Sequence, residues 1–94
     1  MFDPVNLLVP ADERFRTLGP EVGGRYVVAA GGSEEDANQV MAALTAAVDV
    51  AAADAGAGGG VELDFRAPDG VVEVTIRCSG RSSVITHPLP TPKR

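Results

Sequence analysis

The clearest pattern in the sequence is a helical one in its middle. Apolar residues recur there at intervals of three or four, which places them on one face of an α-helix. Ser33 precedes this stretch and Asp36 follows three residues later, an acidic variant of the capping box that starts helices. The pattern predicts a helix of about 22 residues, roughly 33 Å long, from residue 34 to residue 55. Its apolar stripe consists of Ala37, Met41, Leu44, Val48 and Ala51.

The second half of the chain alternates in the way that half-buried strands do. Apolar and polar residues alternate over residues 61–66 and again over residues 72–78, so each segment is predicted to be a strand with one buried face. The Ala-Pro-Asp-Gly sequence of residues 67–70 has turn chemistry, and the two strands should therefore form a β-hairpin. The predicted inward side carries Val61, Leu63, Phe65, Val72, Val74, Ile76 and Cys78.

The first thirty residues have a weaker pattern. Residues 5–9 are short, mostly apolar and followed by a proline, which suits a strand at a sheet edge. The acidic residues after that proline favour the start of a helix. Gly19-Pro20 and Gly23-Gly24 should interrupt it, because proline removes a backbone donor and glycine weakens helices. We therefore expect two short helices, or one kinked helix, between residues 11 and 30.

Together these elements predict an α+β fold. The expected order is β-α-α-β-β, with one more short strand at residues 83–86. The helices would cover one face of a mainly antiparallel sheet in a two-layer sandwich. A chain of 94 residues forms a single domain. We expect it to be folded over about residues 1–86, with the proline-rich residues 87–94 as a loose C-terminal tail.

Charge and composition narrow the classes of function. Thirteen acidic and eight basic residues give a net charge of −5, which argues against a nucleic-acid-binding protein. No apolar run approaches the roughly 18 residues of a membrane span. The first residues lack the basic start and apolar core of a signal peptide. We expect a cytoplasmic protein that binds neither nucleic acid nor a membrane.

Few residues in the sequence suggest chemistry. His87 is the only histidine and Cys78 the only cysteine, which excludes an internal disulfide and a zinc cluster. Cys78 lies on the inward row of its strand, so a buried thiol is favoured over a reactive one. His87 precedes a proline near the chain end, where a surface role is expected. The sequence predicts no catalytic, cofactor-binding or metal-binding residues.

Four segments follow the layout of a known family. They are Val9-Pro10-Ala11-Asp12 with Phe15, the turn at residues 32–36, the helical stretch 43–51, and the strand from Val72 to Gly80. In order and spacing, residues 5–80 resemble the first half of a domain of the anti-sigma-factor serine kinases, which belong to the GHKL (Bergerat-fold) ATPase superfamily.

The resemblance implies where the functional positions of that family would fall. Its water-polarising glutamate, magnesium-binding asparagine and adenine-binding aspartate would correspond to Ala46, Val50 and Cys78, and only a glycine, Gly80, is retained. Alanine cannot act as a base and valine cannot bind magnesium. An alignment shifted by one residue would bring Asp49 to the asparagine position, but the glutamate would still be absent. The resemblance thus implies a catalytically dead domain without a cofactor, rather than an enzyme.

The sequence therefore predicts a non-enzymatic protein-interaction module, an anti-sigma-like regulatory domain whose partner is a sigma factor or its antagonist. The resemblance implies a partner surface at Arg14, Phe15 and Arg16, although these residues would also suit a core phenylalanine between solvated arginines. The alternative is a structural or assembly subunit that acts through self-association. Because a strand that is apolar on both faces needs cover on both, we expect a homodimer with Leu8 in its interface.

Overall fold

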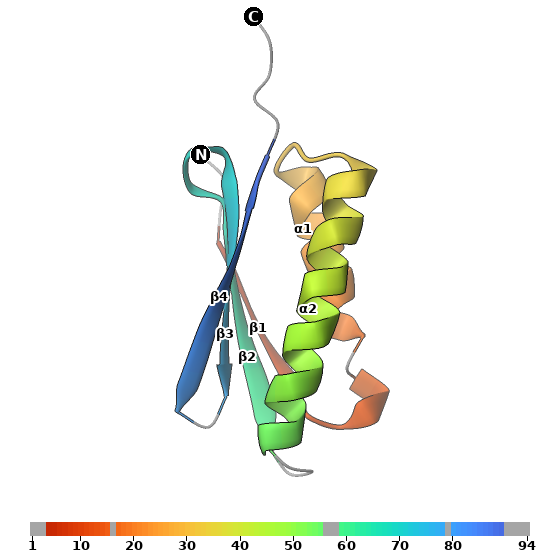
Figure 1. Cartoon of the computed structure of the whole chain (residues 1–94), viewed down its shortest axis with the longest axis vertical. Helices are drawn as coiled ribbons and strands as arrows, with labels where there is room; N and C mark the ends of the chain where they lie inside the picture. Colours follow the sequence, from red (N-terminus) through yellow and green to blue (C-terminus); the bar gives the residue numbers. More distant parts are fainter. Residues whose placement is uncertain (1–3, 16, 56–58, 79, 90–94) are drawn as a thin grey trace, which may run out of the picture.

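Four strands and two helices make up the described part of the chain (Figure 1). The computed structural model describes residues 4–15, 17–55, 59–78 and 80–89. In chain order the elements are β1 (Val5–Pro10), the 3₁₀ turn η1 (Glu13–Phe15), α1 (Leu18–Ala29), α2 (Glu34–Ala55), β2 (Gly60–Arg66), the 3₁₀ turn η2 (Pro68–Gly70), β3 (Val71–Cys78) and β4 (Arg81–Pro88).

The strands form one antiparallel sheet in the order β1-β2-β3-β4. Both helices lie on the same face of this sheet, with α1 over β1 and β2 and α2 over β2, β3 and the flank of β4 (Figure 1). The opposite face, called the open face below, is covered by no helix of the described residues. This arrangement confirms the predicted α+β fold with its helices on one face of an antiparallel sheet.

The last strand is longer than the sequence predicted. A tight turn with Gly80 at φ +78° brings the chain back along β3, and β4 then stays paired with β3 over its whole length, up to Val71 opposite Pro88. His87 and Pro88, which the sequence assigned to a loose tail, therefore belong to the sheet. Leu89, also part of that predicted tail, donates its backbone N–H to the carbonyl oxygen of Gly70 (2.8 Å), and residues 90–94 lie outside the described residues.

The start of α2 is held by a reciprocal capping box. The backbone N–H of Asp36 donates to Ser33 Oγ (3.1 Å), and the backbone N–H of Ser33 donates to Asp36 Oδ2 (2.9 Å). Each bond satisfies a donor that would otherwise lack a partner at the helix start. Glu34 and Glu35 share the first turn, where negative charge interacts favourably with the helix dipole. The predicted helix and its cap are both confirmed.

The glycines of α1 have a packing role that the sequence did not reveal. Gly19 and Pro20 fall in the first turn of the helix, where a proline costs no intrahelical hydrogen bond, so they do not interrupt it. A Cβ atom on Gly23 would collide with Leu44 Cδ1, and one on Gly24 would lie 2.6 Å from Met41 Sδ. The expected break at these glycines is therefore wrong: α1 is continuous from Leu18 to Ala29, and the missing side chains let it approach α2.

The hydrophobic core lies between the two helices and the sheet. Leu44 of α2 and Leu63 and Phe65 of β2 are fully buried, and the ring of Tyr26 packs on that of Phe65 with centroids 5.5 Å apart. Every residue predicted for the inward side of the hairpin is buried. The hairpin prediction and the predicted buried face of α2 are thus both confirmed.

The middle of the open face of the sheet is polar. Asn6 Nδ2 donates to Glu62 Oε2 (2.9 Å) and to Asp64 Oδ1 (2.5 Å), and Arg77 also donates to Asp64. The hydrogen bond from Asn6, and to a smaller extent the one from Arg77, holds the pKa of Asp64 below its usual range. Leu8 lies on this face and is 70% exposed. The open face is therefore polar apart from exposed aliphatic side chains near its two edges, Leu8 on β1 and Val84 on β4, which is 58% exposed.

Candidate functional site

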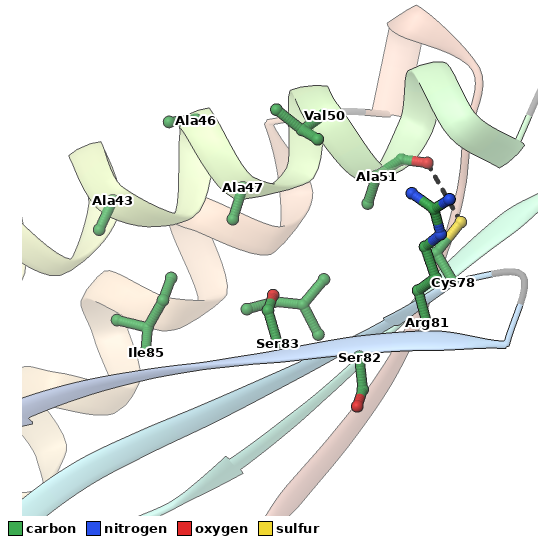
Figure 2. A pocket seen from close by; sticks show the side chains of 11 residues that line it. Ala43, Ala46, Ala47, Val50, Ala51, Cys78, Arg81, Ser82, Ser83 and Ile85 are labelled. Atoms are coloured by element: carbon green, nitrogen blue, oxygen red, sulfur yellow. Dashed lines mark hydrogen bonds between the residues drawn. The ribbon is translucent and has the colours of Figure 1, made fainter.

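The helical layer leaves part of the sheet uncovered. Between α2 and β4 lies an apolar groove of about 520 Å³ (Figure 2). One wall is the flank of α2, the floor is the end of β3, and the other wall is the helix-facing side of β4. In Figure 2, Ser83 and Ile85 point from β4 towards α2, whereas Ser82 points away from it. The α2 wall consists of Ala43, Ala46, Ala47, Val50 and Ala51, and the β4 wall includes Arg81, Ser83 and Ile85.

The groove follows from the register of β4 and from the small side chains of α2. Ser83 and Ile85 pair with Ile76 and Val74 of β3, so they belong to the same helix-facing rows. The two β3 residues are buried, but Ser83 is exposed and Ile85 only half-buried. Alanines on the facing flank of α2 are too short to reach β4. Val50 stands at the rim of the groove and is 68% exposed.

Beyond the groove, β4 also contacts the start of α2. His87 Nε2 lies 2.9 Å from Asp36 Oδ1, and both side chains are less than one-fifth exposed. The hydrogen bond from His87, together with the bonds from Ser33, holds the pKa of Asp36 below its usual range. The surface role expected for His87 is therefore wrong, because β4 continues far enough to bring its ring to the capping box.

This contact predicts that replacing Asp36 changes the melting temperature in a pH-dependent way. We expect Asp36→Asn to lower the melting temperature at neutral pH, because the amide loses the charge that His87 and Ser33 stabilise. The folded-state pKa of Asp36 lies below the roughly 3.9 of an unfolded aspartate. Its contribution is therefore present in full above about pH 5 and is lost as the pH falls through the folded value. The melting temperatures of Asp36→Asn and of the unmodified chain, measured across this pH range, give the size of the effect.

The matched control is Glu35→Gln, which removes one carboxylate charge from the same helical turn at an exposed position. We expect this variant to change the melting temperature much less than Asp36→Asn at neutral pH. A deficit for Asp36→Asn that stays constant down to the lowest pH would show that the carboxylate charge contributes nothing here.

At one end of the groove, Cys78 is buried as the sequence predicted. Its Sγ lies 3.1 Å from the carbonyl oxygen of Ala51 and donates to it. Arg81 extends from β4 towards the same turn of α2 (Figure 2). The thiol thus helps join α2 to the sheet.

The partner surface implied by the resemblance lies elsewhere. Arg14 pairs with Asp12 (2.8 Å) and stacks over the Phe15 ring, 5.5 Å from its centroid. Phe15 is 37% exposed, and Arg16 lies outside the described residues. These residues follow β1 at one edge of the sheet, whereas the groove lies at the β4 edge. The structure does not bring the two surfaces together.

The positions that the resemblance assigned to the family's glutamate, asparagine and aspartate lie along the groove. Ala46, Val50 and Cys78 all line the groove, and Gly80 forms the turn next to it. Their side chains offer apolar contact and one buried thiol. Among the residues that the structure describes, no three His, Cys, Asp or Glu side chains form a group that could hold a metal ion.

Comparison with known proteins provides no family for this chain. No family model matches it, and no curated protein matches its sequence. The resemblance to the anti-sigma-factor kinases therefore stays a prediction from the sequence.

Within the described residues, neither α1 nor α2 combines the length and apolarity needed to cross a membrane.

Proposed function

We propose that this chain is a non-enzymatic protein-interaction module that receives a partner protein in the groove between α2 and β4. The observation that carries this proposal is the uncovered apolar wall of α2, with Val50 68% exposed at its rim. Exposed apolar patches bordered by polar residues are typical of protein-binding surfaces. Following the sequence, we propose an anti-sigma-like regulatory role in the cytoplasm, with a sigma factor or its antagonist as the partner.

The chemistry of the groove favours binding over catalysis. Its walls consist mainly of alanine, valine, isoleucine and serine side chains, which bury apolar area on binding but cannot transfer a proton at neutral pH. Cys78 is buried and hydrogen-bonded to Ala51, and the guanidinium of Arg81 lies at the end of the groove (Figure 2). Such a surface gains affinity by excluding water from apolar side chains.

A charge placed at the rim of the groove tests this proposal. We expect Val50→Glu to weaken capture of the partner from a lysate of the native host by at least about tenfold, because the complex would have to desolvate the new carboxylate. The control is Val28→Glu, which places the same charge on α1 at a valine that is 50% exposed. It should leave capture unchanged, and circular dichroism should show both variants folded.

Two results would contradict the proposal. One is equal capture of the same protein by the unmodified chain, Val50→Glu and Val28→Glu. The other is loss of capture on Phe15→Ala with full capture by Val50→Glu. That result would move the partner to the start of α1, the surface that the resemblance implies.

A second candidate function is that of an assembly subunit that acts through self-association. The observation that favours it is the pair of sheet edges, β1 and β4, each with a strand neighbour on one side only within the described residues. Unpaired edges can pair with another chain. Leu8, which the sequence predicted in a homodimer interface, lies exposed on β1, as such an interface would require.

A further inference from the structure

We propose that two copies of this chain pair through their β4 strands, antiparallel and centred on Val84, so that their sheets join into one. This inference develops the self-association candidate and does not depend on a partner in the groove. The sequence predicted a dimer contact at Leu8, on the β1 edge, whereas this proposal places the contact at the opposite edge of the sheet. The edge chemistry of β4, the pairing of its residues and the charges beside it support the assignment.

The chemistry of β4 suits pairing with another strand. Its central residues, 82–86, have the sequence Ser-Ser-Val-Ile-Thr and contain none of the charges or prolines that protect natural sheet edges. Three of the five are β-branched and favour strands. The other edge, β1, offers a shorter segment between Pro4 and Pro10, whose nitrogens cannot donate to a neighbouring strand. Of the two edges, β4 is therefore the better template.

A two-fold axis through Val84 pairs residues that point to the same side of the sheet. Ser82 would lie opposite Thr86 of the second copy, and Ser83 opposite Ile85. The two Val84 side chains, each 58% exposed, would meet on the open face as a cross-strand pair. Both helical layers would then lie on one side of the joined sheet. No charged residue faces another across the centre of this pairing.

The charges beside β4 select this register. Centred on Val84, the pairing places Arg81 of one copy opposite His87 of the second copy, on the helix-facing side. His87 is hydrogen-bonded to Asp36, and Glu35 lies in the same acidic turn of α2. Arg81 of each copy would therefore approach a carboxylate of the other copy, so the symmetric dimer would have two such contacts. If the axis moved by one residue in either direction, Arg81 would lie opposite Ile85 or past His87 of the second copy. The attraction to the acidic turn would then be lost.

The pairing leaves the groove accessible. Because the two β4 strands would lie side by side beneath the helical layers, the groove of each copy would face that of the other. The result is one wider trough with an α2 helix on either side. Self-association through β4 and partner binding beside α2 are thus compatible.

Cysteine crosslinking tests the proposed contact. We expect Val84→Cys to form covalent dimers in high yield with a short bifunctional thiol crosslinker, because the two thiols would meet at the axis. The matched control, Leu8→Cys, replaces an aliphatic residue that is 70% exposed on the open face of the other edge strand. It should form no covalent dimer, and neither should the unmodified chain, whose single cysteine is buried.

The register is tested by two further variants. Ser82→Cys mixed with Thr86→Cys should crosslink, whereas each alone should crosslink several-fold less. In sedimentation, the unmodified chain should approach twice its mass of 9.6 kDa as its concentration rises. The proposal would be overturned if Leu8→Cys formed covalent dimers while Val84→Cys formed none. It would also be overturned if Ser82→Cys crosslinked as well alone as in the mixture with Thr86→Cys. A mass of 9.6 kDa at every concentration, without crosslinking of any variant, would do the same.

Discussion

Replacing Leu44 by alanine is expected to lower the free energy of unfolding by about 2–5 kcal/mol. Leu44 is fully buried near the middle of α2, where its side chain lies against the backbone of α1 at Gly23. Truncation removes buried apolar area and leaves a cavity that the helix and sheet around it cannot close completely. The loss is a large share of the roughly 5–15 kcal/mol that stabilise a domain.

Urea denaturation of the variant measures this loss. The control is Gln39→Ala, an exposed position on the same helix, which should change the free energy of unfolding by less than about 0.5 kcal/mol. If both variants unfold at the same urea concentration, Leu44 does not hold α2 to the core, and the packing described above is wrong.

Adding a side chain at Gly23 should also destabilise the fold strongly. A Cβ at this position would collide with Leu44 Cδ1 and lie 3.3 Å from Phe65 Cε1, and both of those side chains are fully buried. Gly23→Val would therefore force α1 away from the core, at a cost of about 1–3 kcal/mol or more. Valine has a higher helix propensity than glycine, which offsets only a few tenths of this cost.

Thermal unfolding compares this variant with Ala29→Val, which places the same side chain at an exposed position of α1. We expect Ala29→Val to unfold near the temperature of the unmodified chain and Gly23→Val to unfold well below it. A Gly23→Val chain that is as stable as Ala29→Val would mean that the two helices do not pack closely at Gly23.

The elements with a regular period were predictable from the sequence. The stripe from Ala37 to Ala51 specifies a buried helical face whatever lies opposite, and the alternation from Val61 to Cys78 specifies which side of each strand is buried. Ser33 and Asp36 form their capping box within four residues. In each case, the physical cause acts over a few neighbouring residues and is therefore visible in the sequence itself.

The elements that depend on distant contacts were not predictable in the same way. Gly23 and Gly24 weaken a helix locally, but in the fold they let α1 approach Leu44 and Met41, a benefit that exists only once α2 is in place. His87 looks like part of a proline-rich tail until the register of β4 brings it to Asp36. Tertiary contacts decide both outcomes.

The candidate site was only partly predictable. The resemblance directed attention to Ala46, Val50 and Cys78 as positions without catalytic side chains, and the fold brings these three to one groove. The groove itself depends on where α2 lies over the sheet and on β4 extending beyond its cover. Nothing in the local sequence sets that offset, although the exposed Val50 among the alanines of α2 is a signal that could have indicated a surface contact.

Hydrogen exchange on the complex with the captured partner tests the proposed function most directly. If the partner occupies the groove, amide exchange should slow in residues 43–51 of α2 and residues 81–85 of β4, relative to the chain without the partner. Exchange in η1 and the first turn of α1 should not change. Slowing confined to Phe15 and its neighbours, with residues 43–51 unaffected, would contradict the account and place the partner at the start of α1.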